Sequence, residues 1–219
     1  MPFDHALPFT FVEPIATERL ALRLMVPADV DDIFSYQSRE DVCRYLLFDP
    51  RTRAEVEERV AKHAASTTLE KDGDYLQLAL ELPATGSAPV RVIGDSYFTI
   101  SNLENSRGEI GWTLHPDFAG KGYAAEAARA VLDLAFSQIR LHRVYAELDP
   151  RNDASIALCK RLGMREEAFF LKDLSASVGA VNAFGKSPPV CYTCSLNGYD
   201  AGTYDLPGAF WNARLKYKF

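Results

Sequence analysis

The sequence predicts an α/β or α+β domain built on a mixed sheet. Segments with strand and helix patterns follow one another in the order strand, helices, three strands, helix, strand, helix and strands. The chain has 219 residues, of which 47% are hydrophobic and 25% are charged. These values are typical of a globular protein. The length suits a single domain over residues 1–199 and a C-terminal appendage, poor in charge, over residues 200–219.

Hydrophobic spacing places each element in the chain. Alternating apolar residues predict strands, apolar residues three and four apart predict helices, and prolines make residues 1–17 irregular. Thr52 and Glu55 have the spacing of a capping box, in which each side chain satisfies a free backbone donor at a helix start. The expected elements are strands at 19–26, 75–82, 90–100, 109–114, 143–148 and 190–196, and helices from 27, from 52, at 124–139 and at 154–162.

Charge and cysteine content limit the possible partners. The chain has 24 Lys and Arg against 30 Asp and Glu, a net charge of −6 that argues against a nucleic-acid or anionic-membrane binder. Cys191 and Cys194 are spaced as a metal pair, but two further ligands at matching spacing are missing, so we expect no metal. There is no secretory leader and no apolar run of ~20 residues, so the expected location is cytoplasmic.

The most informative segment runs from Gly108 to Ala127. A predicted strand leads into a turn that contains Gly120, Lys121 and Gly122, and a long helix follows. Glycines let a backbone approach a ligand, and a helix N-terminus attracts anions, so the turn is a candidate phosphate-binding loop. Taken alone, the same glycines are equally typical of a tight corner. The spacings of the dinucleotide fingerprint and of the nucleoside-triphosphate loop are both absent.

Two blocks of this sequence resemble the GNAT N-acetyltransferase superfamily, and most closely its branch that acetylates the N-termini of ribosomal proteins. Ala119-Gly-Lys-Gly-Tyr-Ala124 is similar to the family's pyrophosphate loop. Asn152-Asp-Ala-Ser155, followed by Leu-Gly-Met at 162–164, is similar to its second motif. The resemblance covers about residues 15–172. It departs from the family at Ala119, where relatives carry Gln or Arg, and at Cys159, where many carry Tyr.

The resemblance implies a splayed sheet of about six or seven strands with about four helices, and acetyl-CoA as co-substrate. The acyl-carrying arm is expected in the wedge between the strands at 109–114 and 143–148. The residues implied in binding the cofactor lie on the first strand, in the loop and at the start of the second motif. They are Trp112, Leu114, Ala119, Gly120, Lys121, Gly122, Tyr123, Ala124, Asn152 and Ser155.

Three residues are candidates for catalysis. Glu147 occupies a strand position that carries a catalytic Glu in some relatives, and a carboxylate inside the sheet could have a raised pKa and act as base. Its alternative is an exposed charge at a strand end. Glu109, on the neighbouring strand, is the rival base. Cys159 could protonate the departing thiolate, or it could simply be a small buried side chain.

In the implied reaction, a primary amine attacks the thioester of acetyl-CoA directly. The amine belongs to a protein N-terminus or to a small molecule. One alternative is a CoA-binding sensor or interaction module that has lost catalysis, favoured by the two departures from the family. Another is an acetyltransferase for antibiotics or polyamines. A homodimer is the default assembly, with the aromatic C-terminal segment as a candidate contact.

Overall fold

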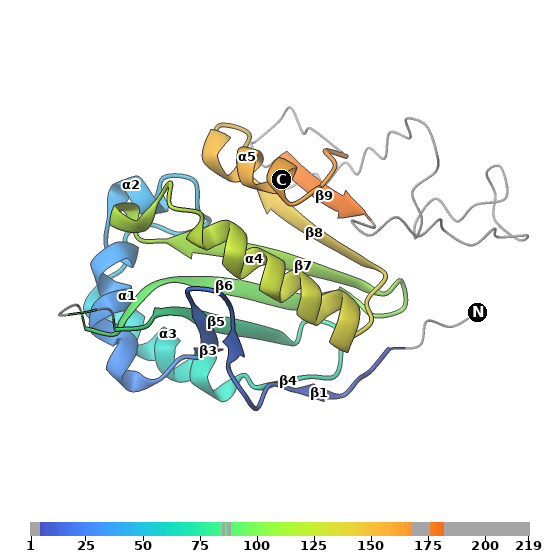
Figure 1. Cartoon of the computed structure of the whole chain (residues 1–219), viewed down its shortest axis with the longest axis horizontal. Coiled ribbons are helices and arrows are strands. Elements are labelled where there is room, and N and C mark those ends of the chain that lie inside the picture. The colour runs from blue at the N-terminus through green and yellow to red at the C-terminus, as the bar shows by residue number, and fades with distance from the viewer. Residues whose placement is uncertain (1–4, 85, 87–88, 168–175, 182–219) are drawn as a thin grey trace, which may run out of the picture.

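The computed structural model describes residues 5–84, 86, 89–167 and 176–181. Within them the chain forms a mixed sheet of seven strands with helices on both faces, which confirms the predicted fold class (Figure 1). The strand expected at 190–196 and the appendage expected at 200–219 lie outside the described residues.

Every pair of neighbouring strands in the sheet is antiparallel except β7 and β8, which are parallel. A separate two-stranded ladder joins β1 (Phe9–Thr10) to β4 (Thr68–Leu69). In order across the main sheet, the strands are β2 (Ile15–Ala16), β3 (Ala21–Leu24), β5 (Tyr75–Leu82), β6 (Arg91–Asn102), β7 (Arg107–Leu114), β8 (Arg143–Leu148) and β9 (Ala176–Val181).

Two sequence expectations need correction. The prediction that residues 1–17 are irregular is wrong for the described part, because β1 and β2 pair there with strands that come later in the chain. The helix predicted at 124–139 forms, but its last part, Leu134–Gln138, is π-helical. The α-helices are α1 (Val30–Gln37), α2 (Glu40–Cys43), α3 (Arg53–Ala65), α4 (Tyr123–Asp133) and α5 (Asp153–Arg161).

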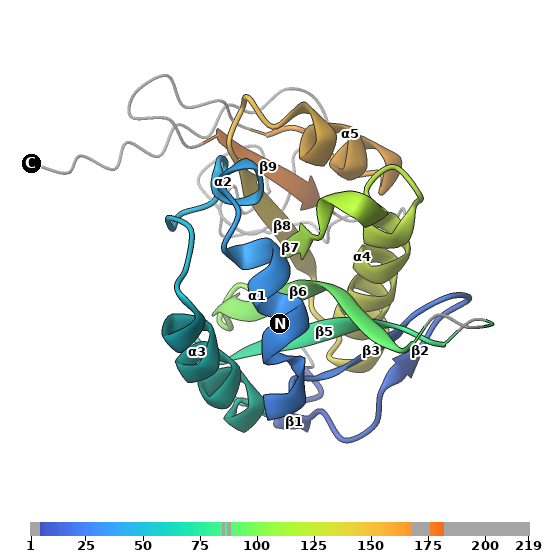
Figure 2. The same cartoon turned by 90° about the vertical axis from the view of Figure 1, so that its left-hand side faces the viewer.

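The helices cover the sheet in two layers, with α1 and α3 on one face and α4 on the other (Figure 2). The larger core lies between the sheet and α4, where Val131 is fully buried against strand residues such as Ile110. The smaller core lies under α1 and α3, where Ile33, Val56 and Val60 are buried. The capping box that opens α3 is confirmed, because Thr52 and Glu55 bond to each other's backbone N–H groups.

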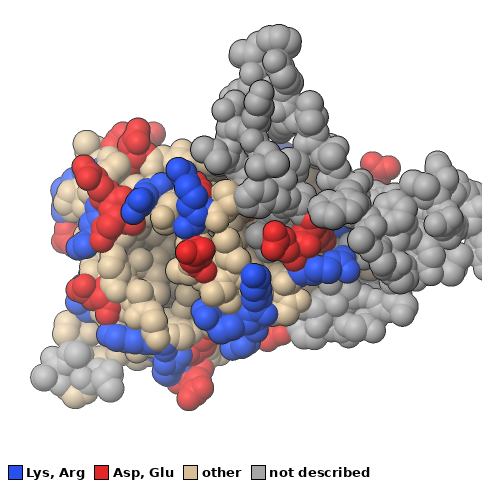
Figure 3. All heavy atoms as spheres, turned by 90° about the horizontal axis from the view of Figure 1, so that it is seen from above, with Lys and Arg blue, Asp and Glu red and all other residues tan. Residues whose placement is uncertain are grey.

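The surface carries both signs of charge in close mixture. On the face seen from above, Lys and Arg side chains alternate with Asp and Glu side chains around a hollow lined by other residues (Figure 3). Within the described residues, no helix is long and apolar enough to span a membrane.

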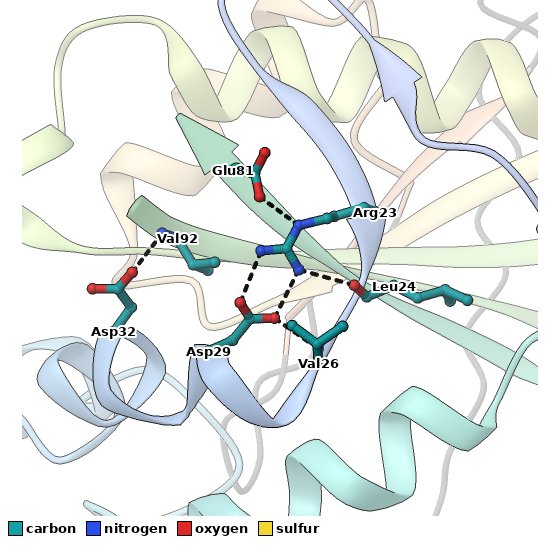
Figure 4. Close-up of polar contacts among 7 residues, drawn as sticks. All are labelled: Arg23, Leu24, Val26, Asp29, Asp32, Glu81 and Val92. Carbon is teal, nitrogen blue, oxygen red and sulfur yellow. Dashed lines mark hydrogen bonds and ion pairs between the residues drawn. The ribbon is translucent and has the colours of Figure 1, made fainter. Parts of the chain in front are cut away.

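Arg23 anchors the start of the first helical segment to the sheet (Figure 4). Its guanidinium donates two hydrogen bonds of 2.8 Å to the buried carboxylate of Asp29 and one of 2.5 Å to Glu81. Asp29 also accepts a bond from the backbone N–H of Val26. Removing one partner of such a buried pair costs about 3–5 kcal/mol, because the remaining charge is left without compensation. The network therefore fixes how α1 sits on the sheet.

Candidate active site

The parallel strands β7 and β8 pair over a short stretch and then separate. Beyond the pair Glu109–Tyr145, residues Ile110 to Leu114 of β7 have register partners on β6 only, among the described strands. Their backbone groups on the β8 side are therefore available to a ligand. The wedge expected between these two strands is present, with Glu109 and Tyr145 at its vertex. The paired positions are Arg107 with Arg143, Gly108 with Val144 and Glu109 with Tyr145.

The loop between β7 and α4 presents unused backbone donors. Gly120 and Gly122 have φ angles of 74° and 86°, a left-handed conformation that side chains with a Cβ rarely adopt. Gly122 is also the N-cap of α4. None of the backbone N–H groups of residues 120–124 donates a hydrogen bond to another described residue. Together with the positive end of the helix dipole, these N–H groups make the loop suited to a phosphate group.

The Lys121 side chain is held by the segment that precedes the loop. Its ammonium donates a hydrogen bond of 2.8 Å to the backbone oxygen of Asp117 and lies 5.3 Å from the ring centre of Phe118. Ala119 is exposed and offers no side-chain donor, as its residue type implies. The anion-binding capacity of the loop therefore rests mainly on its backbone.

A brace from the N-terminal segment holds the loop. The Arg19 guanidinium donates to the backbone oxygen of Lys121 at 2.8 Å and to the Glu126 carboxylate at 2.7 Å. Glu126 also accepts bonds from the backbone N–H of Arg19 at 2.7 Å and from the Thr17 hydroxyl at 2.6 Å. A Cβ atom at Gly122 would lie 3.2 Å from this guanidinium. Sequence reasoning missed this brace, although both ends lie in segments that carry the family resemblance.

The residues expected at the mouth of the wedge contact one another. Asn152 caps α5, because its side-chain oxygen accepts a bond of 3.1 Å from the backbone N–H of Ser155. The Ser155 hydroxyl in turn accepts a bond of 3.2 Å from the indole N–H of Trp112. Leu114 is partly buried against the larger core. The structure thus brings Trp112, Asn152 and Ser155 together, on β7 and on the first turn of α5.

The two candidate bases have different surroundings. Glu109 is partly buried and accepts a hydrogen bond of 3.2 Å from the Tyr145 hydroxyl. Burial raises the pKa of the Glu109 carboxyl, and the negative charge of Glu147 raises it further, while the bond from Tyr145 opposes the shift. Burial raises the pKa of Tyr145 to about 12. Glu147 is exposed rather than inside the sheet, because it lies beyond the point where β8 leaves β7.

Cys159 is fully buried in the larger core, on the side of α5 that faces the sheet. Burial raises the pKa of its thiol to about 11, so the thiol stays protonated at neutral pH. Its surroundings are those of a packed apolar side chain.

Glu109 also belongs to a strip of side chains on the face of the sheet that carries α1 and α3. Register places Tyr75 of β5, Thr99 of β6, Glu109 and Tyr145 in one row. Neighbouring residues in such a row share a face. The rings of Tyr75 and Tyr97 lie 5.9 Å apart, and the ring of His63 on α3 lies 5.6 Å from Tyr75. We call the row together with Tyr97 the tyrosine strip.

Comparison with known proteins gives a consistent result. A family model described as an acetyltransferase (GNAT) domain matches residues 19–165. The uncharacterized N-acetyltransferase p20 of Bacillus licheniformis is 30% identical over 168 residues, which cover 77% of this chain and 90% of that protein. The uncharacterized N-acetyltransferase YnaD of Bacillus subtilis is 32% identical over 158 residues, 72% of this chain and 86% of that protein.

A solved structure supports the same assignment. A GNAT-family acetyltransferase from Bacillus anthracis has a TM-score of 0.66 and 27% identity, and the match covers 77% of this chain and 98% of that one. The splayed strands, the glycine loop at the start of α4 and the family match over residues 19–165 coincide in one region. The chain belongs to the GNAT acetyltransferase family.

Proposed function

We propose that this protein transfers an acetyl group from acetyl-CoA to a primary amine, with Glu109 as the base. Family membership makes the chain an acetyl-CoA-dependent acyltransferase. The position of Glu109 carries the finer proposal, because its carboxylate lies at the vertex of the wedge and has a raised pKa. A base whose pKa moves toward the working pH is better matched to proton transfer.

The residues present fit the co-substrate. Acetyl-CoA supplies an activated acetyl thioester and a pyrophosphate group. The N–H groups of residues 120–124 would bind the pyrophosphate, as would the dipole of α4. The unpaired backbone groups from Ile110 to Leu114 would bond the arm, and Trp112, Asn152 and Ser155 would border it. These roles include most of the contacts expected for the loop, with Lys121 as a minor contributor.

The proposed chemistry needs one proton acceptor and one proton donor. Glu109 takes a proton from the arriving ammonium, and the free amine attacks the thioester carbon. The carbon–sulfur bond then breaks. The proton that the nitrogen loses as the amide forms neutralises the leaving thiolate. Glu147 keeps the pKa of Glu109 raised and does not itself act as the base, because it is exposed. Cys159 is poorly placed to donate a proton to the thiolate, because its thiol is packed in the core.

The primary amine is the feature shared by the acceptors that relatives' names mention. Spermidine N(1)-acetyltransferase of Escherichia coli is 30% identical over 66 residues, 30% of this chain. A putative ribosomal N-acetyltransferase, YdaF of Bacillus subtilis, is 34% identical over 71 residues, 32% of this chain. These partial matches support an amine acceptor and leave both a protein N-terminus and a small molecule as candidates.

The test is calorimetric titration with acetyl-CoA, followed by measurement of thiol release with a panel of peptides and small amines. Micromolar binding with thiol release is expected. Gly120→Val should weaken binding, because a β-branched residue is strained at a φ of 74°. Gly73→Val is the matched control, since Gly73 has a φ of 87° in equally open space outside the loop. Absence of binding would overturn the proposal, and binding without thiol release would favour a sensor.

We also propose a homodimer in which the C-terminal segment takes part, as its apolar and aromatic composition suggests. Deleting residues 200–219 and measuring the mass in solution tests this. A dimeric full-length chain that becomes monomeric on deletion supports it, and an unchanged mass excludes the segment from that role.

A further inference from the structure

Arg51 and Arg59 are two partly buried arginines beside the tyrosine strip. Neither forms an ion pair with any residue that the structure describes. The Arg51 side chain donates to the side-chain oxygen of Gln37, and its guanidinium lies 3.3 Å from the ring centre of Phe48. By contrast Arg53, on the same helix as Arg59, is 52% exposed and pairs with Asp31 and Glu57.

Two carboxylates attract this pair, but neither forms a hydrogen bond or an ion pair with it among the described residues. Asp95 attracts Arg51, but its oxygens accept hydrogen bonds from Tyr36 at 2.6 Å, Gln77 at 2.6 Å and Gln37 at 3.2 Å. Glu55 attracts both arginines, but its carboxylate accepts bonds from the backbone N–H and the hydroxyl of Thr52. Burial and the like charge of Arg59 lower the pKa of Arg51 to about 10. Two neighbouring, partly buried guanidinium groups that form no ion pair with a described carboxylate are suited to bind an anion, because arginine matches carboxylate and phosphate oxygens.

The spacing along α3 directs Arg59 toward the tyrosine strip. Arg59 precedes His63 by four residues, so both lie on one face of the helix. The Nδ1 atom of His63 is 3.3 Å from the Tyr75 hydroxyl, which places that face over β5. The positive charges of both Arg59 and Arg51 lower the pKa of His63, as expected for neighbours. Figure 2 shows α3 alongside the sheet.

The other end of the same row carries negative charge. Glu109 on β7 lies two strands from Tyr75, which corresponds to about 10 Å at the usual strand spacing. The tyrosine strip therefore has two guanidinium groups at the end beside α3 and a carboxylate at the vertex of the wedge. The vertex is where the proposed reaction takes place.

We propose that the acceptor is zwitterionic, with its amine at Glu109 and an anionic group, a carboxylate or a phosphate, bound between Arg51 and Arg59. This inference rests on the proposed function and narrows it to a substrate class. A second ammonium group at the α3 end would be repelled by two guanidinium groups. A neutral group would form no ion pair with either of them. Discrimination by repulsion as well as by attraction is the usual basis of such specificity.

The experiment uses linear ω-amino carboxylates and ω-aminoalkyl phosphates, each compared with the ω-amino alcohol and the diamine of the same length. Thiol release from acetyl-CoA gives kcat/KM for each probe with the full-length protein. We expect an anionic probe to exceed its alcohol by about tenfold or more, the value of one charge-assisted contact. Carboxylate and phosphate series of equal length then distinguish the two anions. The inference is overturned if anionic and neutral probes react at equal rates, and also if none of them reacts.

Variants separate an anion site from a structural role. Arg59→Gln should abolish the preference for the anion, and Arg59→Glu should reverse it in favour of the diamine. Arg53→Gln is the matched control and should leave the preference unchanged. A preference that persists in both Arg59 variants overturns the inference. Calorimetry with acetyl-CoA is run on the wild type and on every variant. Failure of the wild type to bind acetyl-CoA would count against the proposed function itself.

Discussion

The indole N–H of Trp112 donates a hydrogen bond of 3.2 Å to the hydroxyl of Ser155, and so joins β7 to α5 across the opening of the wedge. At this level β7 and β8 no longer pair. Beyond the paired stretch, this side-chain hydrogen bond between β7 and α5 therefore takes the place of backbone hydrogen bonds between β7 and β8. The Asn152 cap, which bonds the backbone N–H of Ser155, orients the acceptor end of this link.

Removing either partner of the hydrogen bond between Trp112 and Ser155 should lower the free energy of unfolding. We expect Trp112→Phe and Ser155→Ala to show a coupling free energy of about 0.5–1.5 kcal/mol in a double-mutant cycle, the net value of a hydrogen bond. Urea unfolding measures it. Additive effects of the two substitutions would show that the contact is not formed in solution. Both variants should also raise the KM for acetyl-CoA.

Glu109→Gln should lower kcat by about 100-fold or more, since general-base catalysis commonly contributes that much. The pKa of Glu109 is raised, so the reactive carboxylate form increases as the pH rises through that value. The wild-type rate should therefore fall on the acid side, and the variant should lose this limb. A variant with near-normal kcat would remove Glu109 from the role of base.

Glu147→Gln tests the coupling between the two carboxylates. Its charge helps to raise the pKa of Glu109, so its removal should shift the acid limb of kcat/KM to lower pH. The maximal rate should stay close to that of the wild type. A large loss of kcat without a shift of the limb would instead make Glu147 the base.

Arg19→Gln should weaken acetyl-CoA binding by about tenfold, because the loop loses one charge-assisted hydrogen bond to Lys121 and its link to Glu126. Arg53→Gln is a suitable control, since Arg53 forms exposed ion pairs with Asp31 and Glu57 on the face of the sheet opposite α4. Calorimetry distinguishes the two. Equal affinity of both variants would show that the brace does not hold the loop for binding.

Burial, together with the positive charges of Arg59 and Arg51, lowers the pKa of His63 from an ordinary value of 6.5 to about 4. A histidine with a depressed pKa contributes stability that is complete above 6.5 and is lost as the pH falls toward 4. Titration of the His63 ring signal by NMR should give this low value. Arg59→Gln should raise the pKa, because it removes a positive neighbour. An unchanged pKa would mean that the two side chains are apart.

Local features were predictable from the sequence. Thr52 and Glu55 read as a capping box because both partners lie in one turn, and the strand at 143–148 follows from alternation alone. The loop at Gly120 and Gly122 was predictable from residue types that permit positive φ. The family resemblance added the wedge, which the strand pairing confirms.

Pairings between distant segments were not predictable. The alternation of Val144 and Ala146 with Glu147 shows which face Glu147 occupies, but its exposure depends on where β8 departs from β7. The bond between Tyr145 and Glu109 needs the register of two strands that are separated by a helix. The placement of Arg59 against the tyrosine strip depends on how α3 packs.

The Arg19 brace has a consequence for how the protein is synthesised. Arg19 and Glu126 are 107 residues apart in the chain, yet both are needed to support the loop that begins α4. On the ribosome the N-terminal segment emerges long before its partner, so it must remain available until Glu126 has left the exit tunnel. The contacts that hold the loop at the start of α4 can therefore form only after both segments have been synthesised.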